Sequence, residues 1–337
     1  MESVNIKQLA KALNLSTSTV SRAFRDNSDI SKETKEKILA KAKELNYQPN
    51  HYASNLREQK SKTIAVIVPE LANNFFSQAI HGIERVARDK GYHILIYATE
   101  DDYEKEVSFI RHLHNGRADG IIMSVSGEAN DHTYLNELSQ KRLPLVFFDR
   151  VYEDIVTPRV ITNDYDSSFA ATQHLIKQGC KQIAYLVINK NLSIGKFRMQ
   201  GYIDALAKYN IPFDDRLVVD CTNSYKKNET ILKRMLLDVR PDGVFTSVER
   251  LAFATYYACY DLKISIPEDL LVIGFSSLEI APLLNPSLTT ITQPATEIGI
   301  QAANLLFKML ERPEEINPSE KIILNSKLIK RRSTERN

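Results

Sequence analysis

From Thr63 to Ser276, short apolar runs of strand length alternate with longer segments whose apolar residues recur at helical spacing. The first such run is TIAVIVPE, and YHILIYATE, GIIMSVS and LPLVFFDR follow with helix-like segments between them. Strands that are apolar on both faces and alternate with helices predict a parallel sheet covered by crossover helices. Most of the chain is therefore expected to adopt an α/β fold.

The alternation starts again after Asp164, so the pattern predicts two successive doubly wound units. The second series of strand-like runs comprises KQIAYLVI, LVVDC, DGVFTSV and DLLVIGFS. Ligands of such folds bind beyond the carboxyl ends of the parallel strands. Two units that face each other therefore predict a ligand cleft between them.

The N-terminal region differs from the rest in charge. Residues 1–62 carry 12 Lys and Arg against 7 Asp and Glu, whereas the remaining residues carry 32 against 35. A basic region attached to a mildly acidic body suggests a polyanionic partner for that region alone. A solvated charged surface is the alternative, and charge by itself does not decide between the two.

Periodicity predicts three short helices in this region. Asn5, Ser16 and Ser31 stand where N-caps belong, and Asn14 suits a left-handed turn after the first helix. The apolar residues at helical spacing are Ile6, Leu9, Ala10 and Leu13, then Val20, Ala23 and Phe24, then Ile38, Leu39, Ala42 and Leu45. Three helices with a tight turn between the first two predict an all-α helix-turn-helix domain.

The second of these helices leaves a polar outer face, formed by Thr17, Ser18, Ser21 and Arg22. An arginine can make two hydrogen bonds to guanine in the major groove, and hydroxyls can donate or accept at base edges. The basic residues expected to contact phosphates are Lys7, Lys11, Arg25, Lys32 and Lys35. A small helical bundle used for protein docking is the alternative.

At this point the sequence resembles a LacI/GalR-type transcriptional regulator. The likeness rests on VNIKQLAKALNLSTSTVSRAF and YQPNHYASNLREQKSKTIAVIVPEL, and it extends to the closing LIKRRST. It implies a three-helix DNA-binding domain at 1–48, a hinge helix and linker at 49–61, and an effector-binding and dimerisation domain at 62–337. That last domain would be a type I periplasmic-binding-protein-like body of two parallel-sheet subdomains, with three chain crossings between them. The expected bounds are about 62–161 with 292–324, and about 162–291 with 325–337.

For DNA binding, the resemblance implies that Thr17, Ser18 and Arg22 read bases. It also implies a hinge helix at Asn50–Arg57, whose Leu56 would open a minor-groove step. Eight helical residues span only about 12 Å and are too short to be stable alone, so this helix is expected to order on DNA. A plain linker is the alternative. The predicted DNA-binding residues are Asn5, Ser16, Thr17, Ser18, Thr19, Ser21, Arg22, Asn50, Ala53, Leu56 and Arg57.

Polar and aromatic residues at the expected strand ends form a candidate effector site. Its members are Asn73, Phe75, Phe76, Asp149, Arg150, Arg198, Glu249 and Ser276. Arg198 stands where an arginine of the family commonly hydrogen-bonds the effector, and its five donors suit hydroxyls or a carboxylate. The alternatives are that Phe75 or Phe76 belongs to the core and that Arg150 forms a surface ion pair.

The sequence departs from the family pattern at three places, which involve four residues. Asn74 replaces a proline, Val248-Glu249 replaces Asn-Asp, and Ser276 replaces an aspartate that usually grips a pair of sugar hydroxyls. Losing that carboxylate while keeping two arginines favours an acidic ligand, such as a sugar acid or sugar phosphate. Glu249 is the alternative source of the missing acceptor.

Several classes of protein have no support in the sequence. A Walker A loop, a GxGxxG after the first strand, a GxSxG elbow and an HExxH are all missing, so neither an enzyme nor a cofactor is predicted. Cys180, Cys221 and Cys259 are spaced too widely for a disulfide framework or a zinc site, and reduced, partly buried thiols are expected. No apolar run reaches the roughly 18–20 residues of a membrane helix, and no signal peptide precedes the first helix, so a cytoplasmic protein is expected.

The predicted function is a sequence-specific DNA-binding transcriptional regulator, a repressor, that binds a near-palindromic operator as a homodimer. A carbohydrate-related small molecule in the cleft would control it. Two alternatives stay open: a DNA-binding regulator controlled by a protein co-regulator, and a sugar receptor that does not bind DNA.

Overall fold

The computed structural model describes residues 5–24, 30–47, 61–113, 116–127, 131–140, 143–188 and 190–336. Contacts divide the chain into two compact units, which we call the head (residues 1–61) and the body (residues 62–337). None of the described helices is long and apolar enough to cross a membrane. The expected hinge helix, with Asn50, Ala53, Leu56 and Arg57, lies outside the described residues.

The head contains the three predicted helices, α1 (Ile6–Leu13), α2 (Thr17–Ala23) and α3 (Lys32–Glu44). Asn5, Ser16 and Ser31 each cap a helix by accepting a hydrogen bond from the backbone N–H three residues further on. Asn14 ends α1 in the left-handed conformation, with φ of 55°. The local residue types therefore account for where these helices begin and for the tight turn after α1.

The core of the head consists of small and branched side chains from all three helices, namely Leu9, Ala10, Val20, Ala23, Ile38 and Ala42. The prediction that Leu39 joins this core is wrong, since 42% of Leu39 is exposed. Successive residues of a helix point about 100° apart, so burying Ile38 turns its neighbour toward solvent.

The body is built on two sheets, each of six strands among the described residues. The first has the order β11-β5-β4-β3-β1-β2 and belongs to what we call the first lobe. Its strands are β1 (Thr63–Val68), β2 (His93–Ala98), β3 (Gly120–Met123), β4 (Leu145–Phe148), β5 (Arg159–Thr162) and β11 (Lys321–Leu324).

The second sheet, with the order β12-β10-β9-β8-β6-β7, belongs to the second lobe. Its strands are β6 (Ile183–Val187), β7 (Val218–Asp220), β8 (Gly243–Thr246), β9 (Leu271–Phe275), β10 (Thr289–Thr292) and β12 (Lys327–Ile329). Within the described chain, neighbouring strands pair in parallel, except that β12 runs antiparallel to β10. Two doubly wound parallel sheets are what the alternating pattern predicted.

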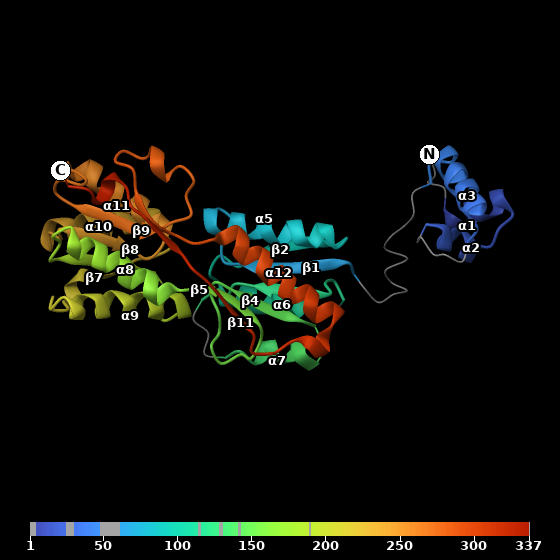
Figure 1. Ribbon diagram of the computed structural model, residues 1–337, viewed down its shortest axis with the longest axis horizontal. Coiled ribbons are helices and arrows are strands. Elements are labelled where there is room, and N and C mark those ends of the chain that lie inside the picture. The colour runs from blue at the N-terminus through green and yellow to red at the C-terminus, as the bar shows by residue number, and fades with distance from the viewer. Residues whose placement is uncertain are drawn as a thin grey trace. The chain divides into compact units, whose positions relative to one another are not determined.

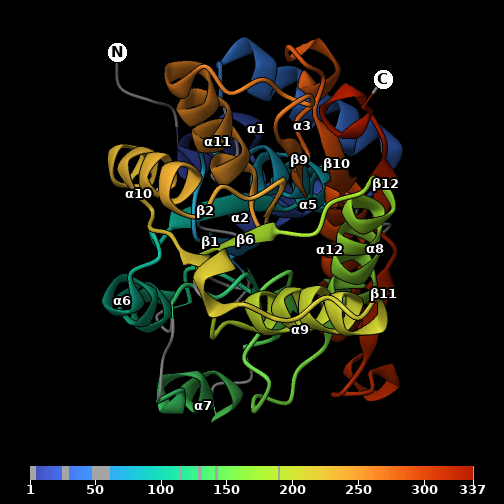
Figure 2. The same cartoon turned by 90° about the vertical axis from the view of Figure 1, so that its left-hand side faces the viewer.

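Helices cover both faces of each sheet (Figure 1). The first lobe has α5 (Asn74–Asp89), α6 (Tyr103–Leu113), α7 (Thr133–Gln140) and α12 (Ala295–Glu311). The second lobe has α8 (Asp164–Lys177), α9 (Ser193–Lys208), α10 (Tyr225–Asp238) and α11 (Glu249–Leu262). Figure 2 looks onto the second lobe, where α8 and α9 lie on one side of the strands and α10 and α11 on the other. Short 3₁₀ helices occupy Asp215–Leu217, Ala281–Leu283, Pro313–Glu315 and Arg332–Thr334.

Strand β1 shows why both faces of the first sheet are apolar. Ile64, Val66 and Val68 pack with α5 and α12, whereas Ala65 and Ile67 pack with α6 and α7. Alternate residues of a strand point to opposite faces, so a strand covered on both sides must be apolar throughout. The edge strand β2 departs from the predicted burial and exposes several of its side chains.

Helices α5 and α12 approach each other closely through two glycines. A Cβ on Gly299 would lie 2.0 Å from the carbonyl oxygen of Ala79, and one on Gly82 would lie 2.2 Å from that of Thr296. No side chain larger than hydrogen fits at either position without moving the helices apart.

The chain crosses between the lobes between β5 and α8, between β10 and α12, and between β11 and β12. The first and third crossings touch, because the side chain of Asn163 accepts a hydrogen bond from the backbone N–H of Ser326 at 2.8 Å. The first lobe therefore includes α12 and β11 from the far end of the sequence, and neither lobe is one continuous segment.

Candidate functional site

The first candidate surface is the outer face of α2 in the head. Thr17, Ser18 and Arg22 are exposed there, whereas Thr19 and Ser21 are half-buried. The Ser16 hydroxyl lies 2.7 Å from that of Ser18 and 2.8 Å from that of Thr19. The hydroxyls of Ser18 and Thr19 are therefore hydrogen-bonded to the N-cap of α2.

Asn5 likewise has a capping function, because it exchanges hydrogen bonds with Gln8 at the start of α1. Arg22 is therefore the main free polar group on this face, because its guanidinium has no hydrogen-bond acceptor among the described residues. Of the basic residues expected to contact phosphate, Lys7, Lys11 and Lys32 are exposed, Lys35 is half-buried and Arg25 lies outside the described residues.

The second candidate surface is a hollow between the two lobes, which we call the cleft. It encloses about 410 Å³, part of which is open solvent. All eight residues predicted from the sequence as effector contacts line it: Asn73, Phe75, Phe76, Asp149, Arg150, Arg198, Glu249 and Ser276. The lining also includes Ile194, Val248, Phe275, Ser277 and Gln293, which were not predicted as effector contacts. Most of these residues follow the carboxyl ends of β1, β4, β8, β9 and β10, where an α/β fold presents its ligands.

The aromatic wall of the cleft is fixed by a helix cap. Asn73 accepts hydrogen bonds from the backbone N–H groups of Phe75 and Phe76, at 3.0 and 3.4 Å, and so starts α5. The two rings meet edge to face with centroids 5.2 Å apart. They belong to the core of the first lobe and also line the cleft, so the core alternative holds, and their contact with an effector stays a prediction.

Arg198 is the most deeply buried charge of the cleft, with 3% of its surface exposed. Its Nε donates to Asp164 and its Nη1 to the carbonyl oxygen of Ser247, both at 2.6 Å. The guanidinium lies 3.7 Å from the centre of the Phe275 ring. Its Nη2 has no hydrogen-bond partner among the described residues. A buried donor without an acceptor is costly, so this nitrogen suits a ligand oxygen.

Arg150 has a similar arrangement on the other lobe. Its Nη1 donates to Asp101 at 2.5 Å, and both side chains are largely buried, so this is not an exposed surface ion pair. Its Nε has no hydrogen-bond partner in the part of the chain that the structure describes. Each lobe therefore contributes one buried guanidinium N–H that has no hydrogen-bond partner among the described residues.

Asp149 adopts the left-handed conformation, with φ of 59°, and is 6% exposed. Burial raises the pKa of its carboxyl group, although Arg198 and Arg150 oppose that effect. Gln293 donates to Asp149 at 3.3 Å and to the hydroxyl of Thr162 at 3.2 Å. Gln293 directly follows β10, so its place at a strand end was a signal that sequence reasoning missed.

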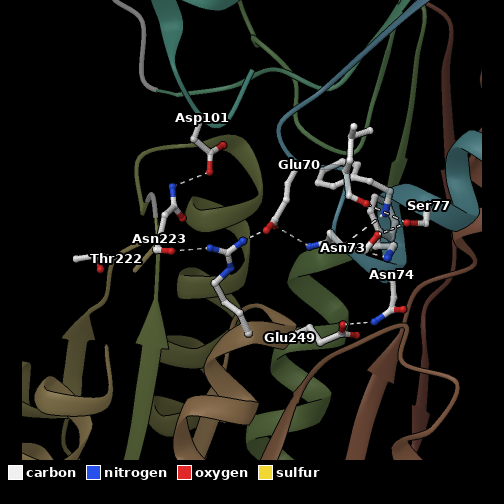
Figure 3. Close-up of polar contacts among 12 residues, drawn as sticks. Glu70, Asn73, Asn74, Ser77, Asp101, Thr222, Asn223 and Glu249 are labelled. Atoms are coloured by element: carbon white, nitrogen blue, oxygen red, sulfur yellow. Dashed lines mark hydrogen bonds and ion pairs between the residues drawn. The ribbon is translucent and has the colours of Figure 1, made fainter. Parts of the chain in front are cut away.

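Glu249 joins the two lobes within the cleft (Figure 3). One carboxylate oxygen accepts from the amide of Asn74 at 2.6 Å, and the other accepts from the hydroxyl of Ser276 at 2.6 Å. The carboxylate thus lies beside the serine that replaces the aspartate of the family pattern. This geometry favours Glu249 as the source of the missing acceptor.

The rim of the cleft carries two further polar bridges that the sequence did not indicate (Figure 3). Arg250 pairs with Glu70, and Asn223 donates to Asp101 at 2.8 Å. Arg250 also donates to the carbonyl oxygen of Asn223 at 2.9 Å. The partners in the two bridges come from opposite lobes, and they are 180 and 122 positions apart in the sequence.

Metal and thiol chemistry have little support in the described ranges. These contain no group of three or more His, Cys, Asp or Glu residues that could hold a metal ion. Cys180, Cys221 and Cys259 are free, and burial raises the pKa of each thiol to about 12. Such thiols are protonated at neutral pH and are poor nucleophiles and poor metal ligands.

Sequence profiles of known families match both units. Residues 61–332 match the family described as periplasmic binding proteins and sugar binding domain of LacI family. Residues 5–50 match the family described as bacterial regulatory proteins, lacI family. The chain belongs to the LacI family. As a LacI-family member it is a DNA-binding transcriptional regulator, with a helix-turn-helix domain ahead of a sugar-binding type of body.

Full-length relatives agree with this assignment to the LacI family. The ribose operon repressor of Halalkalibacterium halodurans is 30% identical over 91% of this chain and 90% of the relative. The transcriptional regulator RegA of Clostridium saccharobutylicum is 31% identical over 98% of this chain and 99% of the relative.

Solved structures give the same result. A LacI-family regulator from Enterococcus faecium with bound ribose is 29% identical, with a TM-score of 0.72 over 80% of this chain and 98% of that one. The lac repressor dimer bound to operator and the anti-inducer ONPF has a TM-score of 0.85 over 99% of both chains. At 24% identity, that second likeness speaks for the fold alone.

Proposed function

We propose that this LacI-family regulator is a repressor that binds its operator as a homodimer and is controlled by a neutral sugar in the cleft. The proposal rests on one observation. The cleft brings together guanidinium donors that lack a hydrogen-bond partner, carboxylate acceptors and aromatic rings. Arg198 and Arg150 supply the donors, and Asp149 and Glu249 supply the acceptors. A sugar hydroxyl both donates and accepts, so it can use the two kinds of group together.

The charge around the cleft favours a neutral sugar over an acidic one. Both arginines are already paired with aspartates, Arg150 with Asp101 and Arg198 with Asp164. Burial raises the pKa of Asp149, and even with that group protonated the carboxylates of Asp101, Asp164 and Glu249 outnumber the two guanidinium groups by one negative charge. An anionic ligand would be repelled by this excess, whereas a neutral polyol would not.

Relatives support the same class of ligand. One is named for the ribose operon, and a solved LacI-family structure of similar identity holds ribose. The rings of Phe75 and Phe76 give the cleft an apolar wall against which the C–H face of a sugar ring can pack. The convergence of polar groups also argues against a cleft that responds only to a docked protein co-regulator.

For the head, we propose base reading by Thr17, Ser18 and Arg22 of α2, supported by the hydroxyls of Ser16, Thr19 and Ser21 and by Asn5 at the start of α1. The supporting observation is that α2 is anchored by its inner apolar side while the predicted contacts lie on its outer side. Asn50, Ala53, Leu56 and Arg57 are proposed as minor-groove contacts on the strength of the family likeness.

Homodimerisation is proposed because both lobes expose apolar groups. The edge strand β2 leaves Leu95 and Ile96 about two-fifths exposed, and an apolar strand edge needs a cover. In the second lobe Tyr257, Tyr260 and Leu283 are 64%, 82% and 80% exposed. A second copy of the chain is the natural cover, since repressors that bind near-palindromic sites are symmetric.

We propose no catalytic role, because the relatives are transcriptional regulators and the cleft groups are explained by ligand binding. A regulator acts where its operator is, so the cytoplasm is the proposed location.

Isothermal titration of the full chain tests the ligand. The titrants are D-ribose, D-glucose, D-galacturonate and D-ribose 5-phosphate. We expect binding by a neutral sugar and none by the two anions, and loss of that binding in Arg198→Ala. The matched control is Arg88→Ala, which removes an exposed arginine that pairs with Glu84 on α5. Binding of the anions alone would reject the neutral-sugar proposal.

A gel-shift titration with an operator fragment obtained by genomic footprinting tests the regulatory part. The sugar that binds the cleft should shift the midpoint of the DNA titration, because ligand and DNA affinities are linked. An unchanged midpoint with every sugar would contradict control through the cleft.

A further inference from the structure

Asn74 and Glu249 lie 175 positions apart in the sequence and meet across the cleft. Asn74 is the first residue of α5 in the first lobe, and Glu249 is the first residue of α11 in the second lobe. The Asn74 amide donates to Oε1 of Glu249 at 2.6 Å (Figure 3). Both side chains are half-buried, so the bond is partly shielded from water.

Glu249 belongs to the ligand site, whereas Asn74 does not line the cleft. The second oxygen of Glu249 accepts from Ser276 at 2.6 Å. An ionised carboxylate offers about four acceptor sites, so roughly two remain after these bonds. No cation pairs with Glu249 among the described residues, which leaves those sites to a ligand hydroxyl.

We propose that Asn74 is a positioning residue that couples lobe closure to the ligand site through Glu249. When the lobes close, the amide fixes the carboxylate in the orientation that a ligand hydroxyl needs. A ligand that binds this carboxylate therefore favours closure, and closure favours the ligand by the same factor. The ligand part rests on the proposed function, whereas the lobe-joining part rests on the contact alone.

The rim bridges make a useful contrast. Arg250 and Asn223 also bind the opposite lobe, through Glu70 and Asp101, but neither lines the cleft. They can stabilise closure without touching a ligand. Asn74 differs from them because its partner, Glu249, lines the cleft.

Reversing the hydrogen bond tests whether the contact joins the lobes. Asn74→Asp places two carboxylates where a donor and an acceptor met, so the contact is lost to repulsion. Glu249→Gln keeps an acceptor oxygen for Asn74. In the double variant the new amide can donate to the new carboxylate, which restores the contact with its direction reversed.

Hydrogen–deuterium exchange of the full chain, followed by mass spectrometry, provides the readout without any ligand. Asn74→Asp should speed exchange in the peptide that covers α11, in the opposite lobe, and the double variant should restore the wild-type rate. Ser77→Ala is the matched control, since Ser77 lies on the same turn of α5 and bonds only to Leu71 and Asn73 of its own lobe. Unchanged exchange in α11, or no restoration in the double variant, would overturn the lobe-joining role.

Titration with D-ribose, or with whichever of the four sugars binds the wild type, tests the coupling. Asn74→Ala should weaken binding about tenfold, the effect of losing one hydrogen bond to a charged group. In a Glu249→Ala background the same change should have no effect, whereas Arg250→Ala should weaken binding in both backgrounds. Equal losses from Asn74→Ala in both backgrounds would overturn the positioning role. If none of the four sugars binds the wild type, the proposed ligand class fails, and the exchange result alone decides the role of Asn74.

Discussion

Asp164 and Arg198 meet at 2.6 Å in the second lobe, with 5% and 3% of their surfaces exposed. Asp164 begins α8 directly after the first lobe crossing, and Arg198 lies on the neighbouring helix α9. The ion pair therefore holds the guanidinium of the cleft in place from the point where the chain enters the second lobe.

Removing the charge of Asp164 should destabilise the body strongly. Asp164→Asn removes the carboxylate that pairs directly with the buried guanidinium of Arg198, and breaking a buried ion pair costs about 3–5 kcal/mol. Glu84→Gln is the control, because it breaks an exposed pair with Arg88 that is worth about 0.5 kcal/mol or less. Urea unfolding of both variants measures the difference, and similar losses would mean that burial of the Arg198 pair has no energetic weight.

Asp149 should lower the free energy of unfolding as the pH rises, as a buried carboxyl group does. Burial raises the pKa of Asp149 in the folded state, so the folded chain binds more protons than the unfolded chain above about pH 4. Stability from this group is therefore present below the unfolded pKa and is lost as pH rises through the raised folded pKa.

Asp149→Asn removes that cost and keeps the left-handed conformation, which asparagine tolerates. We expect the variant to be more stable than the wild type at pH 7.5, with the difference shrinking toward pH 4. Thermal unfolding at both pH values measures it. A variant that is less stable at pH 7.5 would show that the arginines outweigh burial.

Gly299→Ala should destabilise the first lobe. Its methyl group would lie 2.0 Å from the carbonyl oxygen of Ala79, so α5 and α12 must separate, at a cost of about 1–3 kcal/mol. Gln301→Ala on α12 serves as the control, since among the described residues its half-buried side chain bonds only to Glu297 of the same helix. Equal stability of Gly299→Ala and the wild type by urea unfolding would contradict the close approach.

Arg22→Ala should relax base discrimination at one operator position and cost about 1–3 kcal/mol of binding free energy. Lys7→Ala should instead weaken binding evenly on all sequences and reduce the salt dependence by about one unit of slope. Binding to a library of single-base operator variants at several salt concentrations separates the two. An even loss from Arg22→Ala would make Arg22 a phosphate contact.

Local chemistry explains the parts of the fold that were predictable. The caps at Asn5, Ser16 and Ser31 and the left-handed Asn14 depend on neighbouring residues alone, so a sequence pattern is enough to find them. The cleft residues were predictable for a related reason. A parallel α/β fold gathers its strand ends at one edge, so residues that follow strands converge without any knowledge of side-chain contacts. Arg198 is the exception, because it lies within α9 and was predicted from the family resemblance.

Contacts between distant segments were not predictable. Glu249 was predicted as an effector contact and Asn74 was noticed as a departure from the family pattern, but nothing in the sequence indicated that they bind each other. Their meeting depends on how two separately wound lobes face each other, which is a tertiary property. Leu39 shows the same limit on a small scale, because the apolar stripe of α3 is wider than the surface that α1 and α2 cover.

The three lobe crossings also affect the order in which the two lobes can fold during translation. The first sheet needs β11, and the core of the first lobe needs α12, yet both are translated after the whole second lobe except β12 and the 3₁₀ helix Arg332–Thr334. On the ribosome, the segment from α8 to β10 can therefore fold before α12 is made. At that stage the first lobe still has an uncovered apolar face. The first lobe therefore stays incomplete until α12 and β11 have been made, and the second lobe receives its last strand, β12, only after that.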